Sequence, residues 1–190
     1  MLKKFKIIYV IIILTASPCM LAAEELFFTY AGVTAGWGID NIEYKDWFAD
    51  EAETRTRKCS GTYLTGGAIL NIFVNQFIGE FSLEYINIFN DEVPVSHMIY
   101  SATGKYSYQV IELLALTAGA GLYLETPPAS RSYNSGGGIN GAIGSVYNID
   151  RELKIIFDLT ARYGSFGVGE DSTRYSYGAK LGIVYKVGRI

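Results

Sequence analysis

Apolar and polar residues alternate along most of the chain after its first two dozen positions. The clearest example is the C-terminal segment, where every second residue is apolar or aromatic: Tyr175, Tyr177, Ala179, Leu181, Ile183, Tyr185 and Val187. Successive side chains of a β-strand point to opposite faces, so this pattern predicts a strand with one apolar face. That face is long enough for a tilted membrane-crossing strand, which needs about 9–11 residues.

The same alternation predicts eight strands, joined by connections of alternating length. The strands are expected at residues 27–39, 58–73, 77–89, 97–108, 113–125, 136–148, 153–164 and 173–187. Residues 40–57, 90–96, 126–135 and 165–172 form long or polar connections, whereas 74–76, 109–112 and 149–152 form tight turns. Alternating short turns and long loops are typical of an antiparallel up-and-down transmembrane β-barrel, which we predict as the fold. Parity is irregular around Tyr30 in the first strand and around Ile69 and Leu70 in the second, and a bulge is expected there.

Periodicity alone does not decide which face is outside, because a soluble lipocalin-like barrel would turn its apolar face inward around a ligand. The polar face is rich in Gly, Ser and Thr, which suits a narrow lumen. The apolar face carries aromatic residues near both strand ends, as at membrane interfaces. These are Trp37, Tyr85, Tyr100, Tyr163 and Tyr175 at the loop end, and Phe77, Tyr108, Tyr147 and Tyr185 at the turn end. Both features favour an apolar face turned to lipid.

The first 23 residues read as a secretory signal peptide, with lysines followed by the apolar run 7–14 and small residues before Glu24. We therefore expect one barrel domain over residues 24–190, with cleavage after Ala22 or Ala23, or lipidation at Cys19 as the alternative. If Cys19 leaves with the signal peptide, Cys59 is the one cysteine that remains, and it is either a buried small side chain or a reactive thiol. Cleavage of the signal peptide removes three lysines, so the net charge of the mature chain is more negative than the −3 of the full sequence. An acidic chain argues against a nucleic-acid partner.

With these features the chain resembles the small eight-stranded outer-membrane barrels of diderm bacteria, the OmpA, OmpX, OmpW and opacity-type group. The last strand, 175–187, resembles the C-terminal assembly signal of such barrels, although the chain continues with Gly188, Arg189 and Ile190 where the group usually ends on an aromatic residue. The resemblance implies an outer-membrane, cell-surface protein that contacts lipid and the barrel-assembly machinery. It does not choose among adhesion, anchoring, solute passage and lipid modification.

Charged residues of both signs fall on the inward parity, and a charge in a narrow lumen needs a partner. The predicted lumen network consists of Glu80, Glu84, Lys105, Asp158, Arg162 and Lys180. A hairpin between the last two strands places Asp158 opposite Lys180 and Arg162 opposite Ser176, so an ion pair between Asp158 and Lys180 is expected. Such a network would plug the barrel, or alternatively line a polar conduit.

Other chemistry is weakly supported. His97, with Ser96 or Ser101 and Asp91 or Glu92, would be the residues of a hydrolase, but adjacent strand residues point to opposite faces, so we expect no enzyme. We also expect no cofactor and no metal, because one His and one distant Cys make no ligand set. In the first long loop, Tyr44, Trp47 and Phe48 lie among charged residues in the sequence. We expect these aromatic side chains either to pack over the barrel mouth or to form an exposed anchor for a partner or ligand.

We therefore predict a monomeric outer-membrane barrel with a structural or surface-interaction role, its loops offered to an extracellular or host ligand. A narrow, porin-like pore or lateral gate for small hydrophobic solutes is one alternative, and the soluble lipocalin-like binder is the other.

Overall fold

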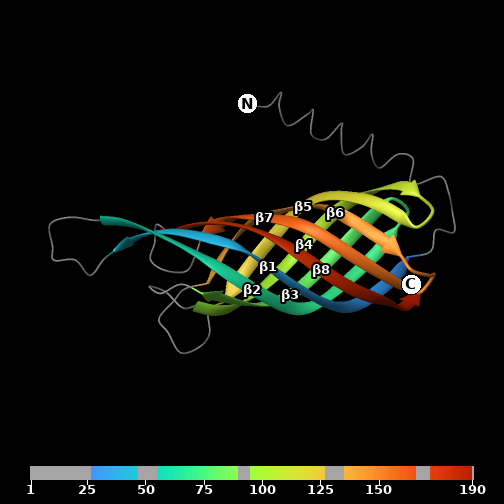
Figure 1. The fold of residues 1–190 in the computed structure, drawn as a ribbon, viewed down its shortest axis with the longest axis horizontal. Helices are drawn as coiled ribbons and strands as arrows, with labels where there is room; N and C mark the ends of the chain where they lie inside the picture. The colour runs from blue at the N-terminus through green and yellow to red at the C-terminus, as the bar shows by residue number, and fades with distance from the viewer. Residues whose placement is uncertain (1–26, 47–54, 90–94, 127–134, 166–171, 190) are drawn as a thin grey trace, which may run out of the picture.

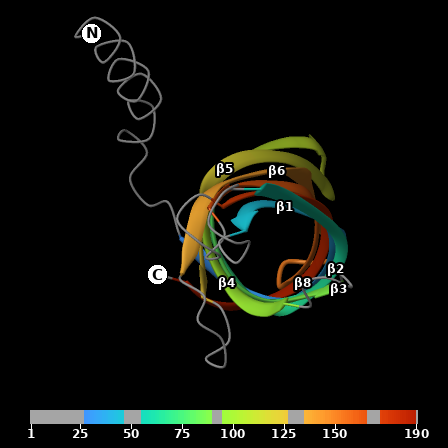
Figure 2. The ribbon, with the colours of Figure 1, turned by 90° about the vertical axis from the view of Figure 1, so that its left-hand side faces the viewer.

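The computed structural model describes residues 27–46, 55–89, 95–126, 135–165 and 172–189. Eight strands make up almost all of this part of the chain: β1 (Phe28–Asp46), β2 (Arg55–Val74), β3 (Phe77–Phe89), β4 (Val95–Ile111), β5 (Leu114–Thr126), β6 (Gly136–Asn148), β7 (Leu153–Ser165) and β8 (Thr173–Arg189). Each strand pairs antiparallel with its neighbour in sequence, and β8 pairs with β1, so the sheet closes on itself (Figures 1 and 2). The predicted eight-stranded up-and-down barrel is confirmed.

The apolar parity faces outward. On β3, Phe81, Leu83 and Tyr85 are exposed, whereas Ser82 and Glu84 between them are buried. Leu181 and Ile183 of β8 are likewise on the outside. The lipocalin-like alternative is therefore wrong, because it needs these side chains inside the barrel. Among the described residues, no helix has the length and apolarity needed to cross a membrane.

The first hairpin is longer than predicted. β1 continues to Asp46 and β2 begins at Arg55, so most of the expected loop 40–57 is paired backbone. The polar composition of this stretch predicts a loop. A two-stranded hairpin outside the membrane can nevertheless form its backbone hydrogen bonds without an apolar face. In Figure 1 the ends of β1 and β2 reach past the other strands on the side of the long connections.

The irregular parity near the turn end has two different causes. The β1–β8 register shifts between Thr29 and Tyr30, as expected for a bulge. The ladders of β2 are continuous on both sides, so the bulge expected there is wrong. Ile69 simply points inward, where it packs in the same apolar cluster as Tyr30.

Tight turns fix the register of the hairpins. Asn75 follows β2 with φ of 53°, a conformation that Asn tolerates better than most residues. Between β6 and β7, the Asp150 carboxylate accepts the backbone N–H groups of Glu152 and Leu153, both at 2.7 Å. The β7–β8 register places Asp158 opposite Lys180, as predicted from sequence.

Candidate functional site

Side chains fill the lumen in layers along the barrel axis. The inward residues of β3 show the order from turn end to loop end: Ile78, Glu80, Ser82, Glu84 and Ile86. Buried apolar residues cluster near the turn end: Tyr30, Ile69, Ile78, Val146, Ile156 and Val184. A second apolar cluster lies toward the loop end: Ile42, Tyr63, Ile86, Ile88, Ile99 and Tyr123. The charged residues occupy the space between and above these clusters.

The six charges predicted from sequence form one alternating chain across the lumen. Asp158 of β7 accepts from Lys105 Nζ of β4 at 2.7 Å, and the same ammonium donates to Glu80 of β3 at 2.6 Å. The other oxygen of Glu80 accepts from Lys180 Nζ of β8 at 2.8 Å. All four side chains are buried, so each depends on its neighbour for charge compensation.

The chain continues toward the loop end through Glu84. Lys180 lies 3.4 Å from one carboxylate oxygen of Glu84, and Arg162 donates to the other at 2.6 Å. Ser82 also donates to Glu84 at 3.0 Å, and its hydroxyl lies 2.6 Å from that of Ser101. The network therefore begins at Asp158 and ends at Arg162, both on β7, and passes through residues of β4, β3 and β8.

The expected ion pair between Asp158 and Lys180 is replaced by longer-range contacts. The two residues face each other in the β7–β8 register, but Lys180 Nζ lies against Glu80 and Glu84, and Asp158 lies against Lys105. Register fixes neighbours along the wall, whereas a lysine in a narrow eight-stranded barrel is long enough to reach the opposite wall. The expected side-chain pairing is therefore wrong although the register is right.

Glycine makes room for these side chains at two points. A Cβ on Gly144 would lie 2.0 Å from the Phe157 carbonyl oxygen and 2.4 Å from Asp158 Oδ1. A Cβ on Gly119 would lie 2.7 Å from Cγ of Lys105. Because Gly119 of β5 and Gly144 of β6 have no side chain, space is left in which the Lys105–Asp158 contact forms.

A second buried cluster, centred on Arg174, lies at the loop end of the lumen. Arg174 Nε donates to Asp40 at 2.7 Å, and Arg174 Nη1 contacts Glu125 and lies 2.9 Å from His97 Nε2. His97 Nε2 is also 3.3 Å from Glu125. Sequence reasoning missed this cluster because Asp40 was assigned to a loop. The usable signal was parity, since Asp40 continues the inward series of Gly36 and Gly38 on β1.

Among the described hydrolase candidates, His97 contacts residues other than Ser96 and Ser101. His97 contacts Arg174 and Glu125, whereas Ser101 lies against Ser82 and Ser96 donates to Asn87 at 2.9 Å. Asp91 and Glu92 lie outside the described residues. In the part of the chain that the structure describes, no group of three His, Cys, Asp or Glu residues could hold a metal ion.

The candidate loop residues lie largely outside the structure's described part. Trp47 and Phe48 are not among the described residues, and of Tyr44 only the backbone is placed, opposite Arg57 in the β1–β2 ladder. The backbone of Cys59 is paired with Ile42. The signal segment 1–23 also falls outside the described ranges.

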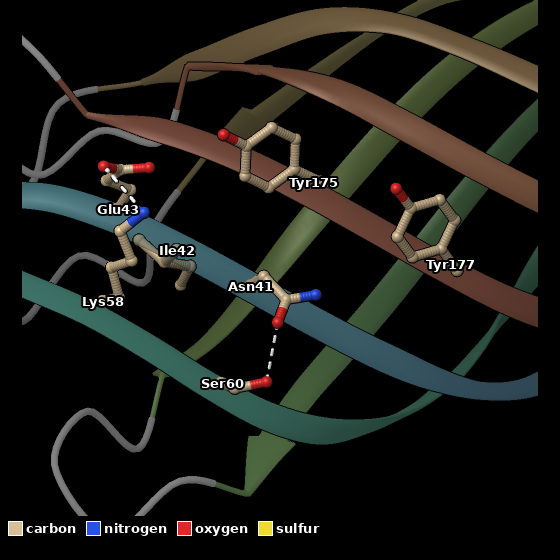
Figure 3. A pocket seen from close by; sticks show the side chains of 7 residues that line it. All are labelled: Asn41, Ile42, Glu43, Lys58, Ser60, Tyr175 and Tyr177. Atoms are coloured by element: carbon tan, nitrogen blue, oxygen red, sulfur yellow. Dashed lines mark hydrogen bonds and ion pairs between the residues drawn. The ribbon is translucent and has the colours of Figure 1, made fainter.

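A pocket of about 370 Å³ lies on the outer wall near the loop end (Figure 3). It is lined by residues of three neighbouring strands: Asn41, Ile42 and Glu43 of β1, Lys58 and Ser60 of β2, and Tyr175 and Tyr177 of β8. Ser60 donates to Asn41 at 2.7 Å, and Lys58 Nζ lies 3.4 Å from Glu43. We call this the outer-wall pocket.

No protein-family model matches the chain, and no curated protein matches its sequence. Several solved structures match its backbone. One is Ail of Yersinia pestis, in complex with the heparin analogue sucrose octasulfate, with 16% identity, coverage of 84% of this chain and 99% of Ail, and a TM-score of 0.43. Neisserial surface protein A matches with 15% identity, 84% and 99% coverage, and a TM-score of 0.47. The N-terminal β-barrel domain of Pseudomonas aeruginosa OprF matches with 16% identity, 77% and 96% coverage, and a TM-score of 0.40.

The class of the protein follows from the barrel itself. A closed sheet leaves no unpaired edge, its outer face is apolar with aromatic residues near both ends, and its lumen is polar in the middle. Only such a closed barrel lets strands lie in lipid without unsatisfied backbone groups. The chain therefore folds as a small, closed eight-stranded β-barrel of the transmembrane type.

Proposed function

We propose that this protein is a closed, non-enzymatic barrel that acts through its loop end at the cell surface. The observation that carries this proposal is the series of buried side chains along the lumen. Two apolar clusters and a chain of five ion-pair contacts, from Asp158 to Arg162, occupy the barrel interior. A lumen of eight strands is just wide enough to be filled by side chains, so no water column is expected.

The surface role is supported by the first hairpin. The paired ribbon of β1 and β2 extends beyond the barrel on the side of the long connections, which face the outside in barrels of this kind. The candidate anchors Tyr44, Trp47 and Phe48 belong to the tip of this hairpin in sequence. We propose that the hairpin presents them to an extracellular or host ligand, and that the barrel works as a monomer placed by the barrel-assembly machinery.

Conductance in a planar bilayer tests the closed lumen. The wild-type barrel is expected to give no steady, large conductance. A variant with Lys105, Glu80 and Lys180 all changed to Ala removes both charge signs from the central chain and is expected to conduct, which shows that the assay detects an opened lumen. Steady conductance by the wild type would refute the closed barrel and favour the narrow-pore alternative.

Surface proteolysis of intact cells tests the orientation. Cleavage within residues 47–54 of intact cells is expected, together with protection of the β2–β3 turn at Asn75. A folded barrel is recognised on gels by its shift in mobility on heating. Cleavage at the Asn75 turn with protection of 47–54 would place the loop end inside the cell and refute the surface role.

A further inference from the structure

The outer-wall pocket shares no residue with the central lumen network or with the candidate anchors Tyr44, Trp47 and Phe48. Its residues combine two aromatic rings with amide, hydroxyl, carboxylate and ammonium groups on one outward face (Figure 3). The ring of Tyr175 is held by a tilted contact with Tyr163, their centroids 5.6 Å apart. Aromatic rings beside several hydrogen-bonding groups are the surroundings that a sugar ring needs, with apolar C–H faces and polar edges.

The charges of the pocket favour an uncharged ligand. Glu43 and Lys58 are paired with each other at 3.4 Å, so the two formal charges compensate. An anionic phosphate would be attracted by the ammonium of Lys58, but it would be repelled by the neighbouring carboxylate of Glu43. A hydroxyl-rich ligand instead finds donors and acceptors in Asn41, Ser60 and Glu43 without an unbalanced charge.

The position of the pocket indicates where the ligand comes from. The outward cross-strand pairs of β1 and β8, read from the barrel middle toward the loop end, are Ala35–Leu181, Trp37–Ala179, Ile39–Tyr177 and Asn41–Tyr175. The wall therefore changes from apolar to polar between Ile39 and Asn41. The pocket is continuous with the lipid-facing belt and begins where the lipid headgroups are expected.

A shallow groove lies nearer the barrel middle on β1 and β8, the two strands that it shares with the pocket, and extends to Phe157 of β7. It has a volume of about 250 Å³ and runs between Trp37, Phe157 and Leu181, over the small residues Ala35, Gly36 and Ala179. Its surroundings are apolar, and in the β1–β8 ladder its pairs Ala35–Leu181 and Trp37–Ala179 are followed toward the loop end by Ile39–Tyr177 and by Asn41–Tyr175 of the pocket. An acyl chain in this groove would place its own headgroup at Asn41 and Ser60.

We propose that the β8–β1–β2 wall binds one glycolipid of the outer leaflet, with its sugar in the outer-wall pocket and an acyl chain in the groove below. The inference rests on the outer-membrane location and not on the closed lumen. A barrel that conducts but keeps the glycolipid would refute only the proposed function, and a closed barrel that fails to bind would refute only this inference.

Native mass spectrometry of the full chain in detergent micelles tests the site. The probes are a galactosyl diacylglycerol and a phosphatidylglycerol with the same acyl chains. One retained copy of the galactolipid is expected, with weaker retention of the phospholipid. Asn41→Leu or Tyr177→Ala should weaken galactolipid binding by about 2- to 12-fold, as for the loss of one hydrogen bond or a comparable contact. Ala179→Leu, which fills the groove, should weaken it as well.

Matched controls lie on the opposite wall. Tyr100→Ala and Ala102→Leu change the same residue types on the outward face of β4, and they should leave binding unchanged. Heat-dependent gel mobility verifies that each variant is folded. Equal retention of the two lipids, equal losses in the β4 controls, or saturable binding of free methyl galactoside as tight as that of the galactolipid would each overturn the proposal.

Discussion

Replacement of Lys105 by Met provides the sharpest test of the lumen network. The variant leaves Glu80 in contact with Lys180 at 2.8 Å, but it removes the ammonium that lies 2.7 Å from Asp158. Asp158 is 0% exposed, so water cannot replace the lost partner. Lys105→Met should therefore destabilise the barrel mainly by leaving the Asp158 carboxylate without an ionic contact.

The size of the effect follows from burial. Two unit charges about 4 Å apart attract by about 4 kcal/mol at an effective dielectric constant of about 20. Removing one partner of a buried pair costs about 3–5 kcal/mol, because the other charge remains desolvated. Asp158→Asn in the Lys105→Met background removes that charge and should recover much of the loss. The coupling energy between Lys105 and Asp158 should be about 0.5–3 kcal/mol, the range for residues in contact.

A second cycle serves as the matched control. Lys180 faces Asp158 directly in the β7–β8 register but contacts Glu80 and Glu84 instead. Urea unfolding in detergent micelles, followed by heat-dependent gel mobility, gives the free energy of unfolding for each single and double variant. The Lys105–Asp158 coupling should exceed the Lys180–Asp158 coupling. The reverse order would mean that lumen side chains pair along the wall, and the described network would be wrong.

Three further outcomes are expected. Gly144→Val should destabilise the barrel by about 1–3 kcal/mol through overpacking. As a control, Gly79→Ala should leave urea unfolding unchanged, because a Cβ added at Gly79 meets nothing within 4 Å. Equal effects of the two substitutions would contradict the close approach at Gly144. Arg174→Met should cost about 3–5 kcal/mol in the same assay, since it strips the cation from two buried carboxylates, and a neutral result would show that the loop-end cluster is hydrated. The backbone N–H groups of Glu152 and then of Leu153 hold the pKa of the Asp150 carboxyl below its ordinary value of 3.8. The ionised carboxylate therefore stabilises the turn above that pH, and this stabilisation is lost as the pH falls through the lower pKa of the folded state. NMR titration of Asp150 should give a midpoint below 3.8, and a midpoint at or above it would refute the turn geometry.

The wall of the barrel could be predicted from sequence because strand parity and tight turns are local properties. The alternation around Leu181 and Ile183 separated the two faces of the last strand, and a hairpin between the last two strands placed Asp158 opposite Lys180. Parity also selected the six central lumen charges. The same parity applies to Arg174 in the last strand and to Asp40, which lies one residue beyond the expected end of the first strand.

The partners inside the lumen could not be predicted in the same way. Lys180 meets Glu80, 100 positions away in sequence, because the closed sheet brings β8 and β3 across from each other. Such contacts depend on barrel diameter, strand tilt and side-chain reach, none of which is encoded in a two-residue period. The outer-wall pocket escaped sequence reasoning for a related reason, since its residues Asn41, Ser60 and Tyr177 come from three strands.

The division of the lumen charges between hairpins has a consequence for assembly. Of the six charges of the central network, the β3–β4 hairpin carries two acids and one base, Glu80, Glu84 and Lys105. The β7–β8 hairpin carries one acid and two bases, Asp158, Arg162 and Lys180. Neither set of three is electrically neutral by itself, and each supplies the counter-charges that the other lacks. A chain cut between β4 and β5 should therefore yield two fragments that reassociate only with each other, and substitutions that swap the charge signs of both fragments together should preserve their mutual recognition.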